Sequence, residues 1–143
     1  MKGLKSNDEG VKEEVSYGAV IYNQIMSCLR SAKGKDVVLR FEAGSHPVVV
    51  KDYEDYKTDV DHLVSLVSII GDDEFWDEME RLDMDFKTRR KKLVDDNEYE
   101  DDEIYIHNQK LIYEYSFKRF NAVLRLLKRQ GVIVESLLRG YRF

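Results

Sequence analysis

The chain contains very little cysteine and proline, with one residue of each, Cys28 and Pro47, among its 143. A single cysteine cannot form an internal disulfide, and this favours a reducing, cytoplasmic location. Cys28 lies in an apolar helical stretch, so we expect a buried and unreactive thiol. The near absence of proline permits long helices and leaves no proline-rich linker between domains. We therefore expect a single domain over residues 11–143, preceded by a polar, flexible segment over residues 1–10.

The chain also lacks long apolar runs. One of the longest, LVSLVSII at residues 63–70, is far shorter than the ~20 residues that a membrane-spanning helix needs. The first residues, MKGLKSNDEG, do not contain the apolar core of a signal peptide. These absences predict a soluble protein that has no membrane partner.

Sequence motifs of catalysis are missing as well. The chain has no G-x-S-x-G nucleophile elbow, no G-x-x-x-x-G-K-[ST] phosphate loop and no G-x-G-x-x-G dinucleotide fingerprint. The acidic run DDNEYEDDE at residues 95–103 fails as a calcium loop, because Glu100 stands where that loop needs glycine and Ile106 where it needs glutamate. Asp59 and His62 are the one Asp/His pair with the helical spacing of metal ligands, and one pair is a weak signal. We predict a non-enzymatic protein without a cofactor or a metal site.

Charge is abundant, and its two signs are unevenly divided. Residues 1–51 carry eight Lys/Arg and six Asp/Glu, residues 52–117 carry eight and twenty-one, and residues 118–143 carry seven and one. The net charge of −5 therefore hides an acidic middle and a basic end. The basic cluster KTRRKK at residues 87–92 closes a helix that begins with acids, which is the arrangement that the helix dipole favours. Because the neighbouring acids should repel phosphate, we interpret this cluster as a neutralised helix end.

Hydrophobic periodicity predicts an α+β, mostly helical fold of about four helices packed with a small β-hairpin. Two β-branched runs, DVVLRFE and PVVVKDY, are joined by the turn-like AGSHP and place the hairpin at residues 36–53. Residues 132–134 could add a third, C-terminal strand, and residues 136–139 could equally continue as a helical turn. The helices are predicted over residues 13–32, 53–70, 72–94 and 103–130.

The last predicted helix has apolar side chains spread well around its circumference. A helix of this kind should be central to the fold, or it should have a partner on its second face. The residues that we expect in the core are Tyr22, Ile25, Leu29, Leu63, Val67, Phe75, Met79, Leu82, Phe86, Phe117, Phe120, Leu124 and Leu127.

These observations favour a protein–protein interaction or assembly module. Because an acidic middle and a basic end can pair between copies, a homo-oligomer is one expected form, although the same charges could also pair within one chain. The predicted acidic binding surface consists of Asp95, Asp96, Glu98, Glu100, Asp101, Asp102 and Glu103. The predicted basic surface consists of Arg125, Lys128, Arg129, Arg139 and Arg142.

Two alternative functions use the same residues. The acidic surface could act as an inhibitor or decoy that fills the basic groove of a nucleic-acid-binding protein, with carboxylates in place of phosphates. The C-terminal Lys and Arg residues are interleaved with aromatic ones and could instead bind nucleic acid directly. One of those aromatics, Phe120, is expected to face the core.

Overall fold

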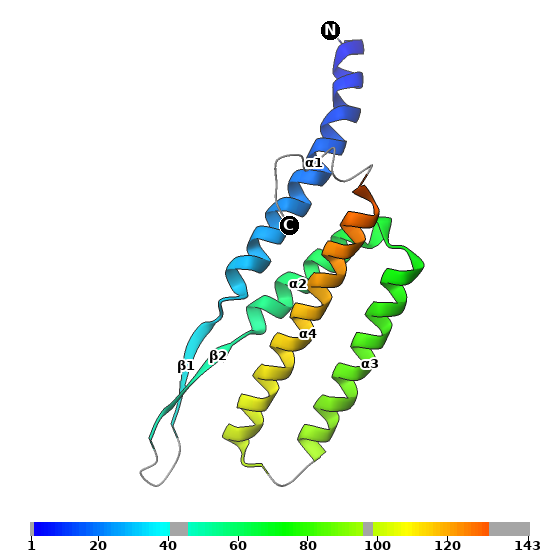
Figure 1. Ribbon diagram of the computed structural model, residues 1–143. Coiled ribbons are helices and arrows are strands. Elements are labelled where there is room, and N and C mark those ends of the chain that lie inside the picture. Colours follow the sequence, from blue (N-terminus) through cyan, green and yellow to red (C-terminus); the bar gives the residue numbers. More distant parts are fainter. Residues whose placement is uncertain (1, 41–45, 96–98, 132–143) are drawn as a thin grey trace.

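A computed structural model describes residues 2–40, 46–95 and 99–131, with side chains described from Tyr17 onward. These residues form four α-helices, one short 3-10 helix and a two-stranded antiparallel sheet (Figure 1). The mostly helical α+β fold with a small hairpin is therefore confirmed, whereas the predicted third strand at 132–134 lies outside the described residues. In chain order the elements are α1 Lys2–Ser31, β1 Lys35–Leu39, β2 Val48–Asp52, α2 Glu54–Val67, η1 Ser68–Ile70, α3 Asp73–Asp95 and α4 Asp101–Arg129.

Most of the predicted helix ends agree with the structure to within two residues. The exceptions are α1, which begins at Lys2 instead of Glu13, and α2, whose last predicted turn is the separate 3-10 helix η1. Gly34 follows α1 with φ at 68°, a left-handed conformation that glycine adopts without steric cost. Asp72 precedes α3, and its Oδ1 accepts a 2.8 Å hydrogen bond from the Phe75 N–H, which caps the helix.

The helices pack in the order α1, α2, α4, α3 across the molecule (Figure 1). Helix α2 packs against α1 and α4, and α4 packs against α2 and α3. The hairpin leaves the helices where α1 ends and α2 begins (Figure 1). Helix α4 is therefore central, as its broad apolar surface predicts. In the described part of the chain, no helix has both the length and the apolar character needed to cross a bilayer.

The core lies where α1, α2, the first half of α3 and the second half of α4 meet. Cys28 is fully buried in it, and burial together with nearby Asp59 raises the pKa of this thiol to about 12, as expected for an unreactive cysteine. Tyr22, Leu82 and Leu124 of the predicted core are partly buried and pack against it. The buried residues that confirm the prediction are Ile25, Leu63, Val67, Phe75, Met79, Phe86, Phe120 and Leu127.

Two of the predicted core residues are in fact exposed. Leu29 on α1 is 47% exposed and Phe117 on α4 is 46% exposed. The periodic pattern places both on the apolar side of their helices, but it does not show how far the neighbouring helix extends. Because α1 packs chiefly on α2, no helix among the described residues packs extensively against one side of α4.

The hairpin pairs β1 and β2 in a register that sets Val37 opposite Val50 and Val38 opposite Val49. Val38 and Val49 are 54% and 60% exposed, whereas Val50 is 8% exposed. The predicted half-exposed sheet is therefore present, with one face toward the helices and one toward solvent.

Candidate functional site

The sides of helix α4 have different environments, and two of them are closed by neighbouring helices. The side toward α2 is closed. Phe120, Val123 and Leu127 are buried there, and the Tyr53 backbone N–H donates a 2.6 Å hydrogen bond to Oε1 of buried Gln109. These contacts fix the position of α4 against the start of α2.

The side toward α3 is closed by aromatic and ionic contacts. The Tyr115 ring stacks on Phe86 with centroids 4.2 Å apart and planes 9° from parallel, and its hydroxyl donates to Asp83. The Arg119 guanidinium lies over the other side of this tyrosine, 4.7 Å from the ring centroid. Each group has a partner within the chain, so this part of α4 offers little to a ligand.

Arg119 also forms the central ion pair of the molecule. Its guanidinium donates to Asp61 of α2, which accepts a second hydrogen bond, 3.0 Å long, from Lys57. Partial burial would raise the pKa of Asp61, but the hydrogen bonds from Arg119 and Lys57 outweigh it and lower that pKa below its ordinary value. The carboxylate therefore remains charged and holds α2 and α4 together.

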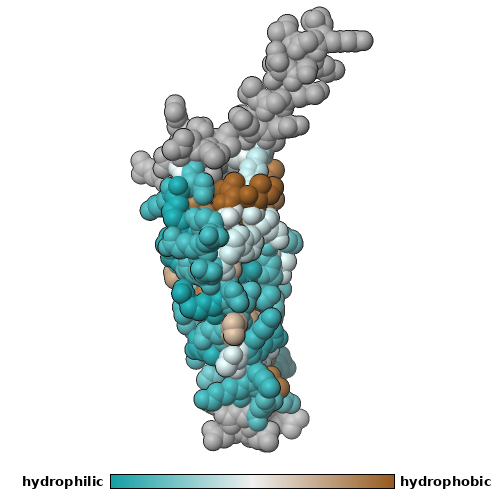
Figure 2. All heavy atoms as spheres, turned by 90° about the vertical axis from the view of Figure 1, so that its right-hand side faces the viewer, coloured by the Kyte–Doolittle hydropathy of each residue, from teal (hydrophilic) through white to brown (hydrophobic). Residues whose placement is uncertain are grey.

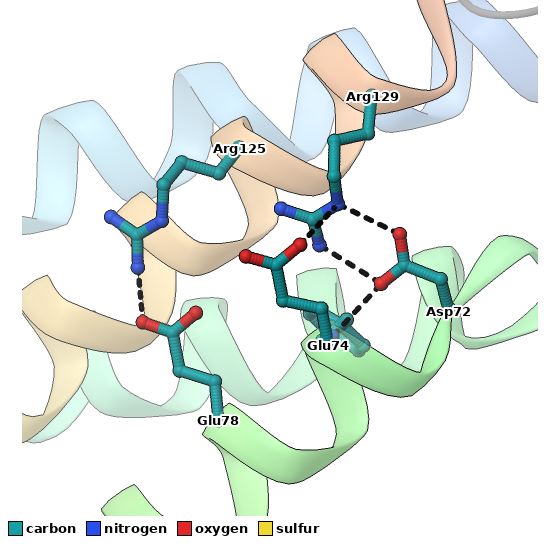
Figure 3. A network of polar contacts seen from close by, with 6 residues as sticks. Asp72, Glu74, Glu78, Arg125 and Arg129 are labelled. Atoms are coloured by element: carbon teal, nitrogen blue, oxygen red, sulfur yellow. Dashed lines mark hydrogen bonds and ion pairs between the residues drawn. The ribbon is translucent and has the colours of Figure 1, made fainter.

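Two of the five predicted basic residues pair with acids of α3 (Figure 3). Arg129 donates from Nε and Nη2 to the two carboxylate oxygens of Asp72, at 2.7 and 2.9 Å, and its Nε lies 3.4 Å from Glu74. Arg125 donates to Glu78. The hydrogen bonds from Arg129 lower the pKa of Asp72, although slight desolvation opposes them. The basic end and the acidic middle thus meet within the chain at these positions.

The other three predicted basic residues are not brought into this network. Lys128 is exposed and has no ion pair with any described residue. Arg139 and Arg142 lie outside the described residues. The predicted C-terminal basic surface for nucleic acid therefore has no support from the described residues, because Arg125 and Arg129 are already neutralised.

The predicted acidic residues gather around the turn between α3 and α4. Asp95 ends α3, Glu100 precedes α4, and Asp101, Asp102 and Glu103 form the first turn of α4, where the helix dipole stabilises negative charge. All five are at least partly exposed, and none has an ion pair with a described residue. Asp96 and Glu98 lie outside the described residues.

The remaining side of α4 carries exposed aromatic rings. Tyr113 packs against Tyr53 and Tyr56 of α2, with centroid distances of 4.7 and 5.9 Å, and against Phe117, 5.9 Å away. Tyr56 is buried, but Tyr113 is 37% and Phe117 46% exposed. The rings thus run from the core to solvent. We call this surface the open flank of α4, with Tyr113 and Phe117 at its centre and partly buried Ile106 and Leu124 toward its ends.

The broad apolar surface of α4 is the one feature of the sequence that indicates its open flank. The prediction that Phe117 is buried is wrong. Apolar residues cover more of α4 than two neighbouring helices can bury. The pattern alone did not show which of these residues would remain uncovered.

Two surface grooves have different linings. One of about 490 Å³ lies between the end of α1 and the start of α2 and is lined by hydroxyl groups, Asp side chains, Arg30 and Lys35. Another of about 450 Å³ lies between α3 and α4, and its mixed lining consists of Arg89, Lys92, Lys110, His107 and Glu114 together with Leu93, Tyr99 and Leu111. Neither lining contains a cysteine. Within the described ranges, no group of three or more His, Cys, Asp or Glu residues could hold a metal ion.

The outer side of α3 differs from the open flank. Figure 2 shows this side of the molecule as mostly hydrophilic, with a hydrophobic band at one end. The exposed Trp76, Met84 and Val94 of α3 are spaced along the helix at intervals of eight and ten residues. Exposed apolar residues scattered singly are common on protein surfaces and indicate no binding site.

No protein-family model, no curated protein and no solved structure matches this chain. The chemistry and geometry of its own residues therefore carry the functional argument.

Proposed function

We propose that this protein is a non-enzymatic protein–protein interaction or assembly module that binds its partner through the open flank of α4. The observation that carries the proposal is the pair of exposed aromatic side chains, Tyr113 and Phe117, on a helix whose other two sides are closed by this chain. Aromatic residues are enriched in the centres of protein interfaces, where they supply much of the binding energy.

The environment of these rings suits them to binding. Tyr113 is held between Tyr53, Tyr56 and Phe117, so it loses little rotational freedom when a partner covers it. Polar residues border the rings. Lys118 lies one position beyond Phe117 and forms a 2.9 Å ion pair with Glu114. An apolar centre with a charged edge is the usual composition of a specific interface.

The test compares the full-length wild-type protein with the variant Tyr113→Ser/Phe117→Ser. Binding is followed by affinity capture with quantitative mass spectrometry and by light scattering, each at low and high salt. We expect the variant to lose at least about tenfold in affinity, because both aromatic anchors are removed. The matched control is Met84→Ser/Val94→Ser on α3, which also replaces two exposed apolar residues. Partners retained by the Tyr113→Ser/Phe117→Ser variant at wild-type level would refute the proposal.

The acidic decoy is a second candidate, supported by Glu100, Asp101 and Glu103, which are exposed and have no ion pair with any residue that the structure describes. The same measurement separates the two functions through their salt dependence. Binding through the aromatic rings changes little with salt, whereas binding of carboxylates to a basic groove weakens steeply. Loss of a captured partner at high salt, with the serine variant unaffected, would favour the decoy.

A further inference from the structure

The open flank of α4 belongs to a longer row of side chains. The row advances along the helix in steps of three and four residues, which keeps all members on one side. Every member is at least partly exposed. We call this row the α4 seam, and it consists of Glu103, Ile106, Lys110, Tyr113, Phe117, Asn121, Leu124 and Lys128.

The α4 seam is symmetric in its chemistry about its own middle. Tyr113 and Phe117 lie on either side of residue 115, and Ile106 and Leu124 lie farther out at equal distances from it. If a second seam is laid against the first in the opposite direction, aromatic meets aromatic and aliphatic meets aliphatic. In a parallel arrangement each residue would meet the same residue of the second copy, so the order of residue types along the helix would not need to be symmetric.

The polar members of the α4 seam are also arranged symmetrically, but each lies opposite a residue of complementary charge or hydrogen-bonding type. Glu103 and Lys128 lie at equal distances from a point between residues 115 and 116, and so do Lys110 and Asn121. In the antiparallel arrangement Glu103 therefore meets Lys128, and Lys110 meets the amide oxygen of Asn121, which can accept its hydrogen bond. In a parallel arrangement Glu103 would meet Glu103 and Lys110 would meet Lys110, which is repulsive.

The charged side chains at the two ends of the α4 seam have no ion-pair partner among the described residues of their own chain. Arg125 and Arg129 are paired with α3, but Lys128 and Glu103 have no ion pair among the described residues. The ends of α4 add to the complementarity. Its first turn carries Asp101, Asp102 and Glu103 and its last turn Lys128 and Arg129, so antiparallel helices place opposite charges together at both ends.

We propose that the partner of the open flank is a second copy of this chain, and that two α4 helices pair antiparallel along the α4 seam in a symmetric dimer. The proposal rests on the proposed function, since it names the partner of that same surface. Symmetric dimers use one patch on both copies, and the patch must then be complementary to itself. Polar pairs inside an apolar seam fix its register, which is the role given to Lys110 and Asn121.

Cysteine cross-linking of the full-length protein tests the orientation. Lys110→Cys and Asn121→Cys are made separately, one of them carrying a mass tag, and the two proteins are mixed under mild oxidation. Antiparallel pairing joins Cys from position 110 to Cys from position 121 and yields a mixed dimer, while neither variant alone forms a cross-link. The wild-type protein is the control for cross-linking through the native Cys28, which is fully buried and should form no cross-link.

A charge exchange tests the register at the ends of the seam. Glu103→Lys and Lys128→Glu should each weaken the dimer by about tenfold, since each creates like-charge contacts at both ends. The double variant Glu103→Lys/Lys128→Glu should regain most of the lost affinity. Light scattering and sedimentation over a range of protein concentrations give the dissociation constants, and circular dichroism confirms that each variant is folded.

The outcomes separate this inference from the proposed function. A mixed 110–121 cross-link, together with recovery in the double variant, supports the antiparallel dimer. Cross-linking of position 110 to itself, or a chain that is monomeric at all concentrations, overturns it. In either of those cases the proposed function still stands if the Tyr113→Ser/Phe117→Ser variant loses a captured partner, and it falls separately if no captured partner depends on these rings.

Discussion

The two outer sides of α4 carry similar residue types but have different surroundings. Toward α3, Tyr115 stacks on Phe86, and Arg125 and Arg129 each contact an acid at the start of α3 or just before it. On the open flank, Tyr113 and Phe117 meet solvent, and Lys128 has no partner among the described residues. Residue type alone therefore does not distinguish groups that stabilise the fold from groups that remain free to bind a partner. The position of the neighbouring helix distinguishes them, and three sets of substitutions test this contrast.

The largest effect is expected from two phenylalanines on adjacent turns of α4. Phe120 is 7% exposed and belongs to the core, while Phe117 is 46% exposed. Phe120→Ala should destabilise the monomer by about 3–5 kcal/mol, because it leaves a cavity among packed side chains. Phe117→Ala should cost only about 1 kcal/mol, because nearly half of this residue already faces water. Urea unfolding at low protein concentration measures both, and equal costs would show that the open flank is part of the core.

A smaller effect is expected from two neighbouring cations. Arg119 is buried beneath its contacts with Asp61 and Tyr115, whereas Lys118 is exposed beside Glu114. Arg119→Ala should lower the free energy of unfolding by about 2–3 kcal/mol, because it removes charged hydrogen bonds from a partly buried carboxylate. The matched change Lys118→Ala should stay within about 0.5 kcal/mol. A cost for Lys118→Ala as large as that for Arg119→Ala would show that burial does not distinguish these two cations.

The smallest effect concerns the pH dependence of the α3 side. The hydrogen bonds from Arg129 lower the pKa of Asp72 in the folded protein, so this carboxylate stabilises the fold above its ordinary pKa of about 4. The contribution is lost as the pH falls through the lowered value. Asp72→Asn keeps a side chain that can cap α3 but removes the charge, and it should cost at most about 1 kcal/mol at neutral pH.

The control for this change is the Glu80→Gln variant, which removes an exposed acid of α3 that has no ion pair with a described residue. Urea unfolding between neutral and acid pH should show a flatter stability profile for Asp72→Asn than for the wild type, and an unchanged one for Glu80→Gln. The reverse order would show that the Arg129 contact contributes nothing.

The elements of the fold could be predicted from the sequence, because each follows from local pattern. Periodic apolar residues, Gly34 and the β-branched runs 37–39 and 48–50 determine the helices, a helix end and the hairpin. The site could not be predicted in the same way. Whether Phe117 is covered depends on α1 packing against α2, a contact between distant segments that no local pattern encodes. The intrachain pairing of Arg129 with Asp72 joins residues 57 positions apart and has the same origin.

The packing order of the helices also determines which parts of the molecule open together. Helix α1 is attached chiefly through α2, where the Tyr17 hydroxyl and the Gln24 amide donate to the backbone carbonyls of Leu66 and Asp59. Helices α2, α3 and α4 are joined to one another by the Asp61–Arg119 ion pair and the Phe86–Tyr115 stack. Separation of α1 would expose Ile21 and Ile25 without breaking either of these contacts. We therefore expect α1 to separate before the unit formed by α2, α3 and α4, and the surface proposed for binding lies on that unit.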